Sequence, residues 1–228
     1  MNLTAGWNMI GVQFVKVGTG EAKALPDAMT LDAGMSGFDE DGNYATVLKV
    51  WDGSNYTTYG WSGTSAGEYM DDPTLNNKWL DGDYQEVPEA SLAAEDAIWI
   101  KAEKAGTVLV SGQVPTNTVV TVPLVAGWNM VANPFPKSVK VSTFGVLSSN
   151  MEGFDEDGNY ATVLKVWDGN NYTTYGWSGT SAGEYMDDST LNNKWLDGDY
   201  QETNDNVDFG HGVWIKAGSA GTITFTAE

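Results

Sequence analysis

Residues 37–86 occur a second time at residues 153–202, and this near-identical repeat constrains the fold more than any other feature of the chain. Only two positions differ between the copies, Ser54 against Asn170 and Pro73 against Ser189. The flanks repeat more loosely, since residues 3–9 correspond to residues 124–130 and residues 99–102 to residues 214–217. We therefore predict two tandem modules of ordinary domain size, at residues 1–117 and 118–228.

The negative charge of the chain is concentrated in the two repeated blocks. The protein has 11 Lys and Arg against 31 Asp and Glu, a formal net charge of −20, and each 50-residue block contributes ten carboxylates and two lysines. Nucleic acids and anionic membrane surfaces are excluded as partners, because both require a basic face. Two interpretations remain open, a solvated acidic surface or clustered carboxylates that hold divalent cations. There is no Cys, which excludes disulfides and thiolate chemistry.

Short runs of β-branched and aromatic residues between turn signals predict antiparallel β structure. Residues 45–51 and 56–61 form the clearest hairpin, because Asp52-Gly53 supplies the positive φ of a tight turn. We expect a second hairpin from residues 98–102 and 107–111, with a counterpart at residues 213–217 and 222–226.

The fold class that follows is all-β, with two tandem antiparallel β-sandwich or barrel-like domains and short helical insertions. Short helices are expected at residues 21–31, 88–94 and 141–147. Residues 62–67 are expected to form a loop, without a helix after it. The module boundary falls near residues 113–123, and this short connection predicts that the modules pack together.

A family resemblance rests on motifs that recur in the same order in both modules. The motifs are Gly6-Trp7-Asn8-Met9, Val50-Trp51-Asp52-Gly53, Trp79-x-Asp81 and Ile98-Trp99-Ile100. In this respect each module resembles a β-rich repeat of large exported proteins of the Verrucomicrobia–Kiritimatiellota–Planctomycetes group. The resemblance implies an extracellular or cell-surface location and implies no catalytic residues.

Alternating acidic residues suggest a calcium site in each block. Asp39 and Asp41, with Asp155 and Asp157 in the second copy, have the alternating oxygen donors of a calcium loop. The pattern is not an EF-hand, because Leu48 occupies the position of the bidentate Glu. Ca²⁺ is therefore the one cofactor we predict, and the alternative is a solvated hairpin turn.

One motif raises the question of catalysis. Residues 63–67 and 179–183 match the G-x-S-x-G spacing of a nucleophile elbow, which needs a strand before it, a helix after it and a His base. The one His of the chain, His211, has no counterpart in the other module. We therefore expect no enzyme, although a glycosidase with paired carboxylates stays open as an alternative.

Aromatic residues are dense in the repeated blocks, which hold 18 of the 27 in the chain. Because the blocks contain few aliphatic residues, many of these rings must form the core. Exposed rings would suit carbohydrate binding, in which sugars stack on aromatic faces. The best candidates for exposed rings are Tyr59, Trp61 and Tyr69, with Tyr175, Trp177 and Tyr185 in the second copy.

The function predicted from the sequence is a non-enzymatic structural protein that self-assembles into an extracellular filament or surface layer. Duplicated modules give a chain two similar surfaces for contacts with other copies of itself, head to tail or through strand edges. The terminal segments, residues 2–13 and 221–227, are β-prone and are expected to offer such edges. The alternative is a tandem carbohydrate-binding module, with glycans as partners. Neither function involves nucleic acid or membrane insertion.

Overall fold

The computed structural model describes residues 1–227, and the first module is built from short strands. They are β1 (Asn2–Leu3), β2 (Gly6–Gly11), β3 (Lys23–Ala24), β4 (Met29–Leu31), β5 (Val47–Trp51), β6 (Tyr56–Trp61), β7 (Trp79–Leu80), β8 (Ser91–Leu92), β9 (Ala97–Ala102) and β10 (Gly106–Val110). They form a five-stranded sheet of order β2-β9-β5-β6-β7, a three-stranded sheet of order β1-β10-β4 and the pair β3-β8. All pairings are antiparallel.

The second module repeats this topology strand for strand. Its strands are β11 (Val119–Leu124), β12 (Gly127–Ala132), β13 (Val139–Lys140), β14 (Val146–Leu147), β15 (Val163–Trp167), β16 (Tyr172–Trp177), β17 (Trp195–Leu196), β18 (Asn206–Val207), β19 (Gly212–Ala217) and β20 (Gly221–Thr226). The sheets have the orders β12-β19-β15-β16-β17, β11-β20-β14 and β13-β18. The predicted all-β fold with two similar antiparallel modules is confirmed. Of the two predicted architectures, a closed barrel is not found in the described chain.

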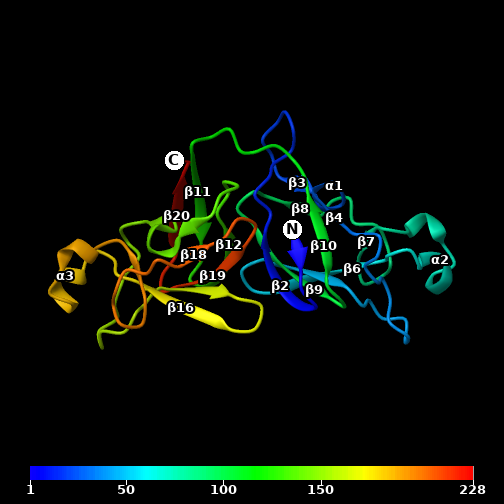
Figure 1. Ribbon diagram of the computed structural model, residues 1–228. Coiled ribbons are helices and arrows are strands. Elements are labelled where there is room, and N and C mark those ends of the chain that lie inside the picture. Colours follow the sequence, from blue (N-terminus) through cyan, green and yellow to red (C-terminus); the bar gives the residue numbers. More distant parts are fainter. Residues whose placement is uncertain (228) are drawn as a thin grey trace.

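Each module buries a core between its five-stranded and three-stranded sheets, as in a β-sandwich. In the first module, Ile98 and Ile100 from β9 and Leu48 from β5 pack against Val108 from β10. The second module has an equivalent core. In Figure 1 the five-stranded sheets lie along the lower side of the molecule and the three-stranded sheets lie above them.

Two tryptophans anchor each core. The rings of Trp61 and Trp79 lie 5.2 Å apart, and the indole N–H of Trp79 donates to the carbonyl oxygen of Met29 at 3.0 Å. In the second copy Trp177 and Trp195 repeat this packing at 5.2 Å. Much of the aromatic content of the repeated blocks is therefore core, as expected.

The predicted hairpin across residues 52–55 is present as β5 and β6, but the other predicted hairpin is wrong. Strands β9 and β10 follow each other in sequence but belong to different sheets, and so do β19 and β20. Both β9 and β10 bury one apolar face in the same core, which is possible only if the chain crosses from one layer to the other.

The helices are shorter than expected. They are α1 (Leu25–Ala28), α2 (Ala66–Tyr69) and α3 (Ala182–Tyr185), with 3₁₀ turns at Pro73–Leu75, Val141–Thr143 and Ser189–Leu191. Residues 21–31 contain β3, α1 and β4, and residues 141–147 contain a 3₁₀ turn and β14. Residues 88–94 contain only the two-residue strand β8 in place of the predicted helix. Residues 66–69 form a helix where only a loop was expected, because a single turn is too short to show helical periodicity.

The terminal strands are paired within the chain, and the prediction of a free edge is wrong for the C-terminal strand. Strand β1 pairs with β10, β2 pairs with β9, and β20 is paired on both sides, with β11 and β14. Residues 221–227 therefore lie inside a sheet, whereas β1 and β2 are the outermost strands of theirs, and Ile10 in β2 also bridges to His211 of the second module. No helix within residues 1–227 is long and apolar enough to cross a membrane.

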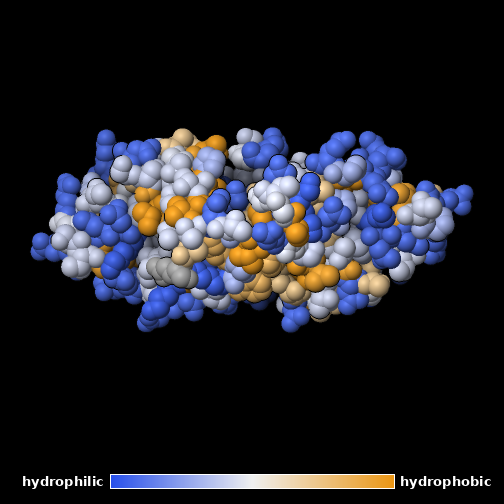
Figure 2. Space-filling view, turned by 90° about the horizontal axis from the view of Figure 1, so that it is seen from above, coloured by the Kyte–Doolittle hydropathy of each residue, from blue (hydrophilic) through white to orange (hydrophobic). Residues whose placement is uncertain are grey.

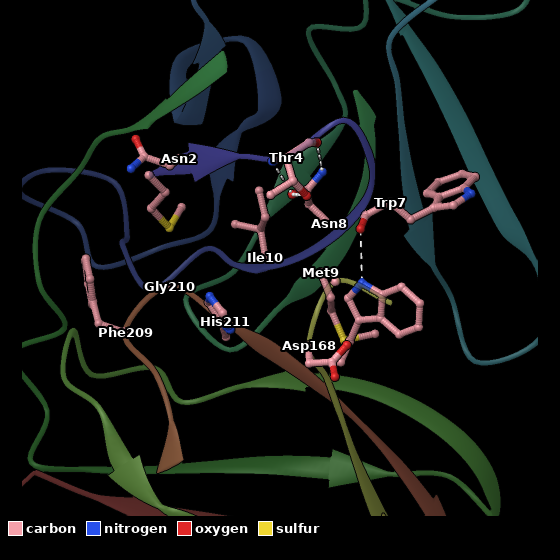
Figure 3. A pocket seen from close by; sticks show the side chains of 13 residues that line it. Asn2, Thr4, Trp7, Asn8, Met9, Ile10, Asp168, Phe209, Gly210 and His211 are labelled. Atoms are coloured by element: carbon pink, nitrogen blue, oxygen red, sulfur yellow. Dashed lines mark hydrogen bonds between the residues drawn. The ribbon is translucent and has the colours of Figure 1, made fainter. Parts of the chain in front are cut away.

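The two modules pack against each other through reciprocal contacts, in agreement with the short connection between them. The amide of Gly11 donates to the carbonyl of Gly210 at 2.8 Å, and the amide of Ala132 donates to the carbonyl of Glu95 at 2.8 Å. Figure 3 shows one side of this junction, where the indole N–H of Trp167 donates to the carbonyl oxygen of Trp7 at 3.0 Å.

Four small residues allow the strands to approach closely at the junction. Gly11 pairs with Ala97 in the first module, and Ala132 pairs with Gly212 in the second. A Cβ atom on Gly11 would lie 2.7 Å from the Cβ of Ala132, and one on Gly212 would lie 2.4 Å from the Cβ of Ala97. Both contacts are closer than two carbon atoms can pack, so each requires glycine on one side.

The repeated blocks end at opposite extremes of the molecule. Figure 1 shows α2 at one end and α3 at the other. Seen from above, the molecule is elongated and hydrophilic residues gather at both ends (Figure 2). The acidic turns of the blocks flank these helices in sequence, so the negative charge predicted from composition lies mainly at the two tips.

We expect stability at the junction to depend on pH through Asp96, which pairs with Val131 across it. Burial raises the pKa of Asp96 to about 6. Because this folded-state value exceeds the unfolded value, the proton stabilises the folded state at low pH, and this stabilisation is lost as pH rises through 6. Asp96→Asn keeps an acceptor for the Ala93 amide. It should stabilise the protein by about 1–2 kcal/mol at pH 8.

Thermal melts at pH 8 and pH 4.5 test this expectation. The gain from Asp96→Asn should shrink to less than half at pH 4.5, where the wild-type carboxyl group is protonated when folded. Glu103→Gln removes an exposed carboxylate and serves as the control. An equal gain at both pH values would contradict the assignment.

Candidate functional site

Strand alternation places a set of aromatic side chains on the outer face of each five-stranded sheet. In β9 the residues Ile98 and Ile100 enter the core, so Trp99 between them points to the opposite face. By the same alternation Trp7 in β2 and Trp51 in β5 lie on the outer face. Tyr56 is the cross-strand partner of Trp51 and extends this row onto β6.

The second module presents the equivalent residues, and the two sets interleave. The indole N–H of Trp51 donates to the carbonyl oxygen of Trp128 at 2.9 Å, reciprocating the bond from Trp167 to Trp7. Trp51 lies edge-on to Trp214, with ring centroids 5.7 Å apart. The rings of Trp99 and Trp167 repeat this geometry at 5.7 Å. We call the combined surface the aromatic face. It comprises Trp7, Trp51, Tyr56, Trp99, Trp128, Trp167, Tyr172 and Trp214.

Two open pockets of about 280 and 270 Å³ hollow the aromatic face. Each pocket is lined by residues of both modules, and Tyr56 and Tyr172 contribute to both. Trp7 and Trp128 are each 36% exposed, and Tyr56 and Tyr172 are each 40% exposed. Large rings that stay this accessible on a folded protein mark a surface suited to a ligand or partner.

A lysine lies beside the rings in each half of the face. The Nζ atom of Lys49 is 5.6 Å from the ring centroid of Trp7 and 5.5 Å from that of Tyr56. Lys165 lies 5.5 Å from Trp128 and 5.7 Å from Tyr172. These cation–π contacts hold each ammonium group over the edge of a pocket.

The tyrosines add polar groups that stay protonated at neutral pH. Burial raises the pKa of Tyr56 above its ordinary value, and the same effect acts on Tyr172. Their hydroxyls can therefore both donate and accept hydrogen bonds. The aromatic face thus combines flat apolar platforms with a few hydroxyl and ammonium donors, which is the composition of a small-molecule or glycan site.

The ring predicted to be most exposed is buried instead. Trp61 and its copy Trp177 are each 1% exposed, because β6 and β16 turn these side chains into the core. Tyr59 is half-buried against the first core, and Tyr175 is buried and donates to Asp205 at 2.7 Å. The prediction of Trp61, Trp177, Tyr59 and Tyr175 as exposed rings is therefore wrong.

Tyr69 and Tyr185 are exposed as predicted, but they lie at the tips of the molecule. Tyr69 stacks on Phe38 at 5.0 Å, and Phe38 stacks on Tyr44 at 5.3 Å. The ring of Tyr84 closes this cluster at 5.5 Å from Tyr44. The second copy is equivalent and borders a cavity of about 490 Å³. Each tip cluster is thus a stacked set of rings beside acidic turns.

The predicted calcium ligands lie in hairpin turns at the same tips. The Oδ1 atom of Asp39 accepts the amides of Asp41 at 3.0 Å and Asn43 at 2.8 Å, and the Asn43 amide lowers the pKa of this carboxyl. Asp155 accepts the amides of Asp157 and Asn159 in the same way. Among residues 1–227 no group of three or more acidic or His side chains is arranged to hold a metal ion. Calcium binding stays a prediction.

The residues of the G-x-S-x-G motif do not come together with a base. Ser65 precedes the single turn of α2 at one tip, whereas His211 lies at the module junction, where it bridges to Ile10 (Figure 3). Ser65 and His211 therefore sit in different parts of the fold.

Comparisons with protein-family models, curated proteins and solved structures found no match. The function is therefore inferred from the geometry of the aromatic face.

Proposed function

We propose that this protein binds carbohydrate outside the cell through the aromatic face. The observation that carries the proposal is the pair of shallow pockets, lined by accessible Trp and Tyr rings from both modules. The axial C–H groups of a pyranose ring form an apolar face that packs on indole and phenol rings. Tyr56, Tyr172 and the two lysines supply donors for the sugar hydroxyls.

The symmetry of the face favours an extended glycan chain over a single sugar. The two pockets are equivalent and are fixed relative to each other by the packed junction. A glycan that fills one pocket brings its next sugar units close to the other pocket. The second contact therefore adds affinity without a further loss of translational freedom. The ligand expected is therefore an oligosaccharide or a polysaccharide.

Substitution of the exposed tryptophans tests this function. Screening the whole protein on a glycan array identifies a ligand, and calorimetry then measures its affinity. Trp7→Ala and Trp128→Ala should each weaken binding about tenfold, because each removes one stacking platform. In the double variant, the loss of binding free energy should be at least the sum of the losses in the two single variants.

Tyr84→Ala is the matched control, since it removes an exposed ring at a tip and not from the aromatic face. It should leave glycan affinity unchanged. Loss of binding in the control but not in the tryptophan variants would move the site to the tips. Absence of any glycan ligand would refute the function.

Self-assembly is the second candidate, and one observation favours it. The two near-identical tip clusters lie at opposite ends of an elongated molecule (Figure 1), so contact between tips would extend a row of molecules without closing it. Light scattering and electron microscopy of the protein with Tyr69→Ser and Tyr185→Ser test this candidate. If the wild type forms polymers and the substitutions abolish them, self-assembly through the tips is supported. A wild-type protein that stays monomeric at high concentration would exclude self-assembly.

A further inference from the structure

The strands beneath the aromatic face carry lysines and no acidic residues. The strands of the two five-stranded sheets, all within residues 1–227, contain four lysines and no Asp or Glu, although the whole chain has 31 acidic residues against 11 basic ones. These lysines are Lys49, Lys101, Lys165 and Lys216. Positive charge is thus gathered in the middle of a protein of strongly negative net charge.

Strand register places all four lysines on the outer face. Lys49 lies opposite Trp99, and Lys101 lies opposite Trp7, so Lys49 and Lys101 are diagonal neighbours across β5 and β9. Lys165 and Lys216 have the equivalent arrangement in the second module. Each half of the face therefore has two lysines in register with its aromatic rings, and the ammonium group of one of them lies beside the exposed tryptophan.

The carboxylates that follow Lys49 and Lys165 in the sequence are held in turns. The Oδ1 atom of Asp52 accepts the amides of Ser54 at 2.8 Å and Asn55 at 2.7 Å, and Asp168 makes the same bonds in the second module. Most other acidic groups of the blocks lie near the tips. At physiological ionic strength their effect on the middle of the molecule is screened beyond about 8 Å.

We infer that the glycan bound by the aromatic face is anionic, with carboxylate or sulfate groups that pair with these lysines. The inference rests on the proposed function and names its substrate class. A neutral glycan would engage the rings but leave the ammonium groups without a charged partner. An anionic glycan uses both features, since its ring faces stack on tryptophan while its acidic groups reach Lys49 and Lys165.

A matched pair of ligands isolates the role of charge. Calorimetry compares a galacturonic acid oligosaccharide with its methyl ester, which has the same backbone without the charge, and with a sulfated galactan oligosaccharide of equal length. We expect the acidic forms to bind at least tenfold more tightly than the ester, and the difference to fall as salt is raised from 0.05 to 0.5 M. The tighter of the two acidic forms identifies the source of the charge.

The variant Lys49→Gln/Lys165→Gln should lose about tenfold in affinity for the acidic ligand and much less for the ester, because glutamine keeps an N–H donor for the sugar hydroxyls but has no charge. Lys16→Gln/Lys140→Gln reaches the same net charge from exposed positions outside the two five-stranded sheets and should bind as the wild type does. Equal loss in both variants would show only a long-range effect of net charge and would overturn the inference.

The remaining outcomes separate this inference from the function on which it rests. Equal binding of acid and ester, both weakened by Trp7→Ala, would keep the carbohydrate function and overturn the anionic class. If the protein binds none of the three ligands and no glycan on the array, both the anionic class and the carbohydrate function are overturned. A third outcome is that the wild type binds no glycan but forms oligomers, and that Lys49→Gln/Lys165→Gln dissociates them. This result would overturn the inference and indicate that the lysines bind the acidic tip of a second copy.

Discussion

Trp79→Ala is expected to destabilise the first module by about 3–5 kcal/mol. Trp79 is almost fully buried and packs on Trp61, so its removal leaves a large cavity between the two sheets. The substitution also leaves the carbonyl oxygen of Met29 without its indole donor. For a module of this size the loss corresponds to a fall of about 10 °C or more in melting temperature.

The duplicated block supplies an internal control for this result. Trp195→Ala makes the same change in the second module, where the indole donates to the carbonyl oxygen of Phe144 at 2.9 Å. Calorimetry should show the lower transition in whichever module carries the substitution, and limited proteolysis identifies that module. Tyr84→Ala, at an exposed ring, should change the melting temperature by less than about 2 °C. A similarly small change for Trp79→Ala would contradict the packing described.

Gly212→Val is expected to separate the two modules. A Cβ atom at this position would lie 2.4 Å from the Cβ of Ala97 and 3.2 Å from the Cγ of Met9, and the Ala97 atom is attached directly to the backbone. The strands must move apart to admit the valine, which costs about 1–3 kcal/mol of packing between the modules. The movement also pulls Trp51 and Trp214 away from each other, so both pockets should be lost.

This outcome is distinguishable from general unfolding. The variant should show two thermal transitions, increased radius of gyration in solution scattering, and strongly reduced glycan affinity, while near-UV dichroism retains the signal of the packed core tryptophans. Gly198→Ala, where a Cβ meets nothing within 4 Å, is the control in the same module. A single transition and unchanged binding would show that the junction tolerates the added volume.

Much of the fold could be predicted from local features of the sequence. Asp52-Gly53 and its copy specify a tight turn, and the β-branched and aromatic runs on either side specify β5 and β6, because both are properties of a few adjacent residues. The repeat implied that the second module would follow the first strand for strand. The pairing of β9 and β10 with different sheets could not be read locally, because it depends on strands far away in the chain.

The candidate site, too, is predictable from the sequence only in part. Alternation along β6 puts Tyr56 and Trp61 on opposite faces, so the sequence by itself determined that these two rings have different environments. Which of them is buried depends on where the three-stranded sheet packs, and that is a tertiary contact. The prediction that Trp61 is exposed is wrong for this reason. Trp7 and Trp99 lie outside the repeated blocks, so the aromatic density of those blocks does not point to them.

The sequence therefore determined the duplicated β architecture and the acidity of the repeated blocks, because repeats, turn residues and charge are each visible within a single segment. Only the tertiary structure decided the aromatic face. It forms because Gly11 and Gly212 let two sheets approach, and because Trp51 and Trp167 each bond to a carbonyl of the other module. The bond from Trp167 to Trp7 joins residues 160 positions apart, and the geometry of such contacts is set by the packing of whole sheets and not by any local pattern.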